Sequence, residues 1–400
     1  MTTLEILQRA NDVLIGNYAR QPVVMQRGQG AELWDTDGHK YLDLFAGFGG
    51  AILGHCHPDL IRAATEQMHK LWHVGNTWHT EPQIEFAERL NRTAFAGQAF
   101  FCHSGLEANE AACKLARLRG QTFTPGRWKI ISLNKSFHGR SLAMISATGN
   151  PAVKQGFGPN VPGFVQVEPG NIEALAAAID DETAGVLMEP IQGEGGVNIY
   201  PAGYAAAVRK LCDEKQLTLI FDEVWTGGGR TSKWFGYQHF KDADGNRVEP
   251  DIITLGKAIG GGLPVGAMLA KKEIAKLMVP GRHGCTLGGN PTCMAVARTI
   301  FDVIERDKLL EHAHKLGDRA KVRLIEDTKL KERVVDVRGE GLMLGIELKQ
   351  PPEKLVERGL ANGVIINLTA SKVIRLAPPL TISPEQWERG LDAVAKTIAE

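Results

Sequence analysis

Short apolar runs alternate with helix-like stretches through the middle of the chain. The runs are rich in β-branched residues, which is typical of strands buried on both faces of a mainly parallel sheet. They are residues 129–133, 185–189, 218–222, 252–255 and 265–270. Helical spacing of apolar residues predicts the helices 106–118, 171–179 and 204–215. Strands and helices that alternate in this way predict an α/β layer fold.

The two ends of the chain follow different patterns. Residues 31–42 predict a β-hairpin that turns at 35–38. Near the other end, Ser383 and Pro384 favour the start of a last helix. Before it, the pattern predicts helices at 292–304 and 309–328 and strands at 334–337, 343–348, 364–367 and 373–376. We expect a large domain over residues 61–295 and a smaller α+β domain over 296–400, to which residues 1–60 contribute.

Composition narrows the class of protein. The 400 residues suit two or three domains, and 43% hydrophobic residues suffice for a sizeable core. Lys+Arg and Asp+Glu both number 46, so no charge bias favours nucleic acid. No apolar run approaches the ~18 residues of a membrane span, and the first residues lack the apolar core of a signal peptide. The 6 cysteines show no zinc spacing, so we expect reduced thiols and a cytoplasmic protein.

A lysine and an acid follow two of the predicted strands. Lys257 stands between the strand 252–255 and a run of glycines, and Asp222 ends the strand 218–222. Ligands of parallel sheets bind at the carboxyl ends of the strands. A desolvated lysine amine can lose its proton and condense with an aldehyde. The pair therefore favours pyridoxal phosphate (PLP), although the acid could cap a turn and a lone lysine is most often solvated.

Two more loops carry candidate binding groups. Ser104 opens a helix, where free backbone N–H groups bind phosphate, but with Glu107 it also fits a capping box. Phe137 could stack on a flat ring and Arg140 could clamp a carboxylate. The simpler interpretation is a core phenylalanine beside a surface arginine.

An arginine within an apolar strand needs a partner. Arg375 lies in the strand 373–376, and a buried guanidinium is costly unless it is paired. Glu194, in a glycine-rich loop, or a substrate carboxylate could pair with it.

Taken in order, these segments resemble the class III, or ornithine/acetylornithine, aminotransferases. The resemblance runs nearly end to end and rests on motifs that begin at Leu33, Leu53, Ser104, Phe137, Pro190, Phe221, Gly227, Leu255, Gly288 and Arg338. It implies the PLP-dependent transferase fold type I, which has a mainly parallel seven-stranded sheet flanked by helices and a smaller α+β domain built from both termini.

The resemblance implies roles around the cofactor. Lys257 matches the lysine that forms the Schiff base and shuttles the proton, and Asp222 matches the partner of the pyridine nitrogen. Val224 and Phe137 match the residues on the two faces of the ring. The phosphate site matches Ser104, Gly105 and Leu106, and the remaining cofactor positions are His138, Trp225 and Thr286.

The resemblance also implies how substrates and a second subunit contribute. Arg140 and Arg375 match the pair that binds carboxylates, and Glu194 matches the acid that masks Arg375 when an ω-amine is bound. Tyr18 matches a tyrosine near the far end of the substrate. Thr286 matches a residue that reaches the phosphate of the other subunit, which implies a homodimer with shared active sites.

Some positions depart from the family pattern. Trp225 replaces a glutamine, His103 an asparagine, Leu106 an alanine or threonine, and Ala51 an asparagine. None of these is the lysine or the acid, so the departures concern the substrate more than the class of reaction.

The implied reaction is ping-pong transamination of an ω-amine. N2-acetylornithine with 2-oxoglutarate, which would give N-acetylglutamate 5-semialdehyde and glutamate for arginine biosynthesis, is the first expectation. Ornithine, succinylornithine, 4-aminobutyrate and succinyl-diaminopimelate enzymes and an aminomutase are alternatives within the family. A metal hydrolase built on His55, Cys56 and His57 is a remote alternative, and a Rossmann dehydrogenase lacks its GxGxxG motif. We expect no resident metal.

Overall fold

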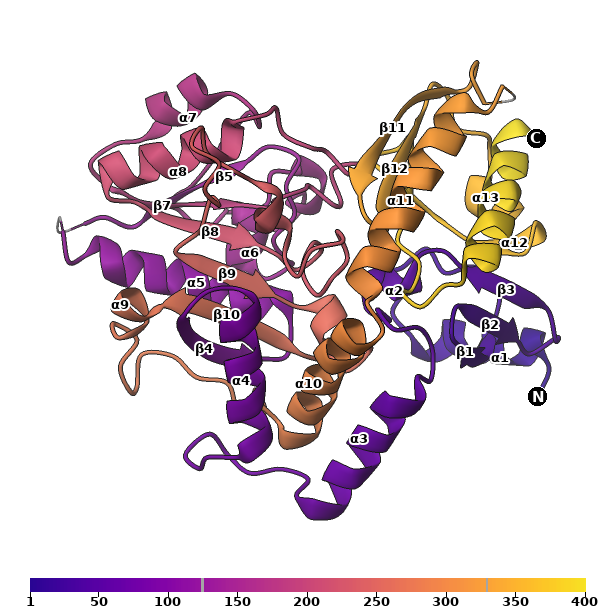
Figure 1. Cartoon of the computed structure of the whole chain (residues 1–400), viewed down its shortest axis with the longest axis horizontal. Helices are drawn as coiled ribbons and strands as arrows, with labels where there is room; N and C mark the ends of the chain where they lie inside the picture. The colour runs from indigo at the N-terminus through magenta and orange to yellow at the C-terminus, as the bar shows by residue number, and fades with distance from the viewer. Residues whose placement is uncertain (124–125, 329) are drawn as a thin grey trace.

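The computed structural model of the chain describes residues 1–123, 126–328 and 330–400. A seven-stranded sheet lies at the centre of the lobe at the left of Figure 1, in the order β4-β10-β9-β8-β7-β5-β6. β10 runs antiparallel to both of its neighbours, and the other pairings are parallel. The bounds are β4 (Gly97–Cys102), β5 (Lys129–Leu133), β6 (Phe164–Val167), β7 (Thr183–Met188), β8 (Thr218–Asp222), β9 (Ile252–Leu255) and β10 (Gly266–Lys271).

Helices cover both faces of this sheet. Successive side chains of a strand point to opposite faces, so both sets are buried. In β8, Ile220 joins an apolar cluster with Leu115 of α5 (Gly105–Gly120). Its neighbours Leu219 and Phe221 belong to a second cluster, which includes Val208 of α8 (Tyr204–Lys215). The continuous apolar runs in the sequence are thus explained by helices on both sides. The other helices of this lobe are α3 (Pro58–Lys70), α4 (Glu81–Thr93), α6 (Leu142–Ala147), α7 (Ile172–Ala178), α9 (Lys272–Ala275) and α10 (Pro291–Arg306).

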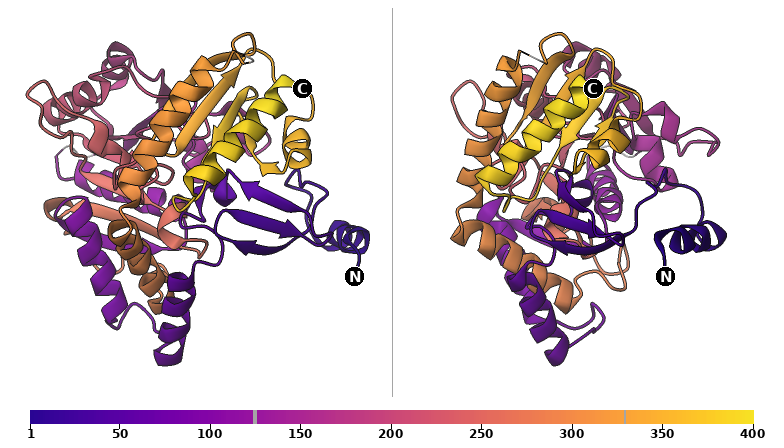
Figure 2. Two further views of the ribbon diagram at one scale, coloured as in Figure 1. Left: turned by 45° about the vertical axis from the view of Figure 1, so that its right-hand side comes forward. Right: turned by 90° about the vertical axis from the view of Figure 1, so that its right-hand side faces the viewer.

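The two ends of the chain meet in a second lobe, at the right of Figure 1. The predicted hairpin forms, and its second strand pairs in parallel with β13, so an N-terminal and a C-terminal segment share one sheet. Figure 2 shows this sheet beside the yellow helix α13. Its strands are β1 (Met25–Gln29), β2 (Glu32–Asp35), β3 (Lys40–Asp43) and β13 (Val364–Ile365).

The other sheet of this lobe is antiparallel and has the order β11-β12-β15-β14. Its strands are β11 (Val334–Glu340), β12 (Met343–Leu348), β14 (Asn367–Thr369) and β15 (Val373–Leu376). The remaining helices are α1 (Thr3–Val13), α2 (Ala46–Gly49), α11 (Leu309–Glu326), α12 (Leu355–Ala361) and α13 (Pro384–Ala399). Ser383 caps α13 by accepting the N–H of Gln386, as predicted.

One predicted strand is wrong. Residues 364–367 do not form a single strand, because β13 ends at Ile365 and pairs with β3, whereas β14 starts at Asn367 and pairs with β15. The intervening Ile366 is buried and carries the chain from one sheet to the other. The domain boundaries at residues 60 and 295 remain a prediction, and α10 runs across the second of them.

Candidate active site

The catalytic candidates lie around a cavity of about 390 Å³ at the carboxyl ends of β4, β5, β8 and β9. These strands run in one direction, so the segments that follow them meet at one edge of the sheet. Of the residues predicted from the sequence, those lining the cavity are Ser104, Gly105, Leu106, Phe137, His138, Arg140, Asp222, Val224, Trp225 and Lys257.

Lys257 follows β9 and begins a short 3-10 turn, η3 (Lys257–Gly260). Its φ is 44°, in the left-handed region that residues with a side chain rarely adopt, a feature that often marks functional positions. Its Nζ lies 4.1 Å from the centre of the Trp225 ring. Burial lowers the pKa of Lys257 from 10.5 to about 8, although Glu194 favours the charged form. At pH 7 roughly a tenth of this amine is therefore unprotonated, far more than for an ordinary lysine.

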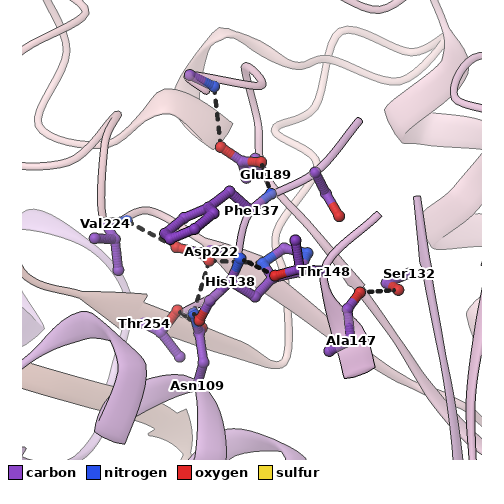
Figure 3. A network of polar contacts seen from close by, with 12 residues as sticks. Asn109, Ser132, Phe137, His138, Ala147, Thr148, Glu189, Asp222, Val224 and Thr254 are labelled. Atoms are coloured by element: carbon purple, nitrogen blue, oxygen red, sulfur yellow. Dashed lines mark hydrogen bonds and ion pairs between the residues drawn. The ribbon is translucent and has the colours of Figure 1, made fainter. Parts of the chain in front are cut away.

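Asp222 is the last residue of β8 and the centre of a buried polar network (Figure 3). Its Oδ2 accepts a 2.7 Å hydrogen bond from Asn109 Nδ2 and lies 2.7 Å from His138 Nδ1. Its Oδ1 accepts the backbone N–H of Val224 at 3.1 Å. Asn109 in turn accepts from Thr254 Oγ1 at 2.6 Å. Contacts with Asn109, His138 and Val224 therefore fix the position and orientation of the carboxylate at the end of the strand.

Sequence reasoning missed Asn109, which lies on α5 and reaches Asp222 across the sheet edge. The family motif that begins at Ser104 contains this asparagine, but the sequence alone did not assign it a role. Glu189, at the end of β7, was also left without a role. It accepts the N–H groups of Phe137 and Gly193, both at 3.0 Å, and burial raises its pKa to about 7. Figure 3 shows the Phe137 ring above this network.

The start of α5 forms one wall of the cavity. Ser104 caps the helix, because its Oγ accepts the N–H of Glu107 at 3.3 Å and donates to Glu107 Oε2 at 2.9 Å. The first N–H groups of a helix have no partner within it and are free to bind an anion. A Cβ on Gly105 would lie 2.4 Å from Val224 Cγ2. Glycine is therefore needed for the close approach of α5 to the segment after β8.

The buried Arg375 and the half-buried Glu194 form an ion pair next to the cavity. Arg375 is 0% exposed, and its Nη1 lies 3.0 Å from Glu194 Oε1. Burial acts to raise the pKa of Glu194, but the charges of Arg375 and Lys257 outweigh it and hold that pKa below its usual value. The carboxylate is therefore charged at neutral pH and compensates the guanidinium.

Trp225 connects this ion pair to Lys257. Its Nε1 donates to Glu194 Oε1 at 3.1 Å, and the Arg375 guanidinium lies 4.3 Å from its ring centre. A Cβ on either Gly49 or Gly193 would come within 2.7 Å of the indole. The two glycines thus make the slot that holds the ring.

The structure does not bring every predicted residue to the cavity. Arg140 is exposed at its edge, with its guanidinium 5.5 Å from the centre of the Phe137 ring. Tyr18 is 67% exposed and Thr286 is exposed, and neither lines the cavity. The roles expected of these last two remain predictions.

The histidines of the remote hydrolase alternative have separate partners. His55 Nε2 lies 2.8 Å from Asp43 Oδ2, and His57 Nδ1 accepts the N–H of Asp59 at 3.3 Å. Cys56, between them, is exposed. Within the described chain these three side chains do not gather into one set of ligands.

Among the described residues, no helix is both long enough and apolar enough to cross a membrane.

The family model described as aminotransferase class-III matches residues 15–398. An acetylornithine aminotransferase of Myxococcus xanthus is 41% identical over 97% of this chain and 96% of its own length. Another, from Methanothermobacter thermautotrophicus, is 42% identical over all of both chains. The solved ornithine aminotransferase of Toxoplasma gondii superposes with a TM-score of 0.93 at 31% identity, covering 100% of this chain and 95% of that one. The chain belongs to the class III aminotransferases.

Proposed function

We propose that the chain transfers the terminal amine of N2-acetylornithine to 2-oxoglutarate, forming N-acetylglutamate 5-semialdehyde and glutamate. Relatives that are named acetylornithine aminotransferase and match nearly the full length support this substrate. The observation that carries the proposal is the ion pair of Glu194 with the buried Arg375, near Lys257, which suits an enzyme that must accept both an ω-amine and a dicarboxylate.

Class III aminotransferases depend on PLP, and the residues around the cavity fit this group. Asp222 is a buried carboxylate, and within the described chain its only ion-pair partner is His138. A protonated ring nitrogen would supply the compensating charge. The start of α5, with glycine at its closest approach to Val224, would hold the phosphate. The residues proposed to bind the phosphate are Ser104, Gly105 and Leu106.

The chemistry follows from the environment of two side chains. When bound, PLP supplies an aldehyde that condenses with amines and a ring that withdraws electrons from the carbon beside that amine. Lys257, with its lowered pKa, would bond to the cofactor and, once displaced, carry the proton to and from the substrate carbon through Nζ. Asp222 would keep the ring nitrogen protonated, while Phe137 and Val224 would hold the ring on its two faces.

Two arginines would sort the two substrates. N-acetylornithine brings its terminal amine to Lys257 and would leave its carboxylate near the exposed Arg140. Arg375 then keeps its ion pair with Glu194. 2-Oxoglutarate carries two carboxylates, and Glu194 would turn away so that Arg375 can bind one of them. Tyr18 would lie near the far end of the substrate.

The active unit is proposed to be a cytoplasmic homodimer. Thr286 is exposed and outside the cavity of its own chain, which suits a residue that reaches the phosphate site of a second copy. The known substrates of the family are amino acids and keto acids, so no nucleic-acid or membrane partner is proposed.

The substrate is tested by single half-reactions of the cofactor-loaded enzyme, followed by cofactor absorbance. We expect acetylornithine to react with the highest kcat/KM among acetylornithine, ornithine, 4-aminobutyrate and succinyl-diaminopimelate. A clear preference for ornithine would favour the activity named for the Toxoplasma structure, and turnover without 2-oxoglutarate would indicate an aminomutase. Borohydride reduction followed by peptide mapping tests the chemistry separately, since an adduct on any lysine other than Lys257 would overturn the site assignment.

A further inference from the structure

One carboxyl that lines the cavity has no part in the reaction proposed above. Glu189 follows β7 directly and is 2% exposed. Within the described chain its hydrogen-bond partners are two backbone N–H groups, and no cationic side chain of that chain forms an ion pair with it. A carboxylate without a cation is costly to bury, so the place of this one needs an explanation.

The two N–H groups belong to different segments of the site. Glu189 Oε1 accepts from Phe137, which comes after β5, and Oε2 accepts from Gly193, both at 3.0 Å. Figure 3 shows the contact with Phe137. Gly193 adjoins Glu194 and forms one wall of the slot that holds Trp225. One carboxylate therefore joins the segment that carries the Phe137 ring to the segment that carries Glu194.

An ionised carboxylate suits both contacts, because each of its oxygens accepts. A carboxamide accepts with one atom and donates with the other, and a neutral acid carries a proton on one oxygen. Among the described residues neither N–H group has another acceptor. An amide in place of Glu189 would therefore leave the N–H of either Phe137 or Gly193 facing a donor.

We propose that Glu189 is a positioning residue, which fixes the Phe137 ring over the cofactor and the backbone beside Glu194 relative to each other. Glu194 can then turn away from Arg375 by moving its side chain while Gly193 stays in place. This role rests on the function proposed above, but it needs only the cofactor and the ion pair, whichever amine is the donor.

A second contact keeps the two segments packed when Glu189 is changed. Gln192 Nε2 donates to the carbonyl oxygen of Asn134 at 2.8 Å, and neither of these residues lines the cavity. We therefore expect Glu189→Gln to fold and to bind the cofactor, with its ring or the Glu194 segment less firmly held.

Two measurements on cofactor-loaded Glu189→Gln test the two contacts. PLP has no chiral centre, so its visible circular dichroism arises from how the protein holds the ring. Release of Phe137 should weaken this dichroism per bound cofactor and lower kcat in both half-reactions. Release of Gly193 should lower KM for 2-oxoglutarate relative to KM for the fastest donor, because Glu194 then leaves Arg375 more easily. The affected constant should change by roughly tenfold or more, since a hydrogen bond to a charged group corresponds to at least that factor.

Glu189→Asp separates the bridge from the charge. Aspartate keeps the charge but is one methylene shorter, so it too can hold only one of the two segments. We expect it to behave as the amide variant does.

Glu223→Gln is the matched control. Glu223 is also buried and accepts two backbone N–H groups, those of Gly236 and Tyr237, both at 2.7 Å. Burial raises its pKa to about 7, like that of Glu189, but it does not line the cavity. Both glutamine variants should lower Tm, whereas the dichroism or the KM ratio should change in Glu189→Gln alone.

The proposal is overturned if Glu189→Gln keeps the native dichroism and KM ratio, if Glu189→Asp restores both, or if Glu223→Gln loses them as well. Preference of the native enzyme for another donor would refute the proposed substrate and leave this comparison intact.

Discussion

The indole Nε1 of Trp225 donates to Glu194 Oε1 at 3.1 Å, on the same carboxylate oxygen that lies 3.0 Å from Arg375. The residue that departs from the family's glutamine therefore holds the acid in its paired position. Glu194 has to leave this position before Arg375 can receive a substrate carboxylate, so the hydrogen bond should make binding of 2-oxoglutarate less favourable.

Trp225→Phe should relax this restraint. Phenylalanine keeps a ring between the two glycines but loses the donor, and a hydrogen bond to a charged group contributes about 1.5–3 kcal/mol. We expect KM for 2-oxoglutarate to fall by roughly tenfold relative to KM for the amine donor, since about 1.4 kcal/mol corresponds to a factor of ten. Half-reaction kinetics measure the ratio. Trp78→Phe, at an exposed position, is the control, and an unchanged ratio would count against the restraint.

Arg375→Ala should harm the two half-reactions unequally. Without the guanidinium, one carboxylate of 2-oxoglutarate has no partner in the site, and losing one partner of a buried charge pair costs about 3–5 kcal/mol. We expect kcat/KM for 2-oxoglutarate to fall by roughly two decades or more, and that for acetylornithine by much less. Arg140→Ala should slow both half-reactions, because each substrate would place a carboxylate near Arg140. Equal losses in both half-reactions for Arg375→Ala would contradict the proposed sorting of substrates.

Asp222→Ala should impair chemistry far more than folding. The variant removes the carboxylate that accepts from Asn109 and Val224 and that would balance the ring nitrogen. Leaving a buried cation unpaired costs about 3–5 kcal/mol, or roughly two to four decades in kcat at 1.36 kcal/mol per decade. Asp222→Asn keeps the volume of the side chain but removes its charge, and its kcat should fall nearly as far. Normal turnover in either variant would refute the assignment.

The reactivity of Lys257 should change with pH near its lowered pKa. Since burial places that pKa at about 8, the amine is protonated below this pH and nucleophilic above it. In cofactor-free enzyme, reductive methylation of Lys257 should rise with pH and reach half its maximum near pH 8. Peptide mass spectrometry measures it, with the exposed Lys210 as an internal reference. A midpoint above pH 10 would show that burial does not shift this group.

Gly105→Ala should weaken cofactor binding, because its Cβ would lie 2.4 Å from Val224 Cγ2. The approach of α5 to the cavity would then widen. We expect at least a tenfold increase in the Kd for PLP, measured by titration of cofactor-free enzyme. Combining it with Val224→Ala, which removes the opposing methyl groups, should restore part of the affinity. Gly16→Ala, where a Cβ meets nothing within 4 Å, is the control, and additive effects in the double variant would rule out this clash as the cause.

The sequence by itself predicted five strands of the central sheet, though not β4 or β6, and the residues at two of the strand ends. Apolar periodicity and caps are local properties, so β8, β9 and α8 were predicted with the bounds that they have, and Asp222 and Lys257 were found at adjacent strand ends. The strand at 364–367 failed because local pattern does not show that Ile365 and Asn367 pair with strands of different sheets.

Only the tertiary structure decided which side chains meet. Asn109 supports Asp222 across 113 residues of sequence, Trp225 reaches Glu194 across 31, and Cys285 meets His103 across 182. The first two contacts depend on the way the parallel strands bring the segments that follow them to one edge of the sheet, and the third brings the loop between α9 and α10 to the segment after β4. Distances along the chain carry no information about this arrangement, because it arises from packing of whole layers and not from the pattern within any one segment.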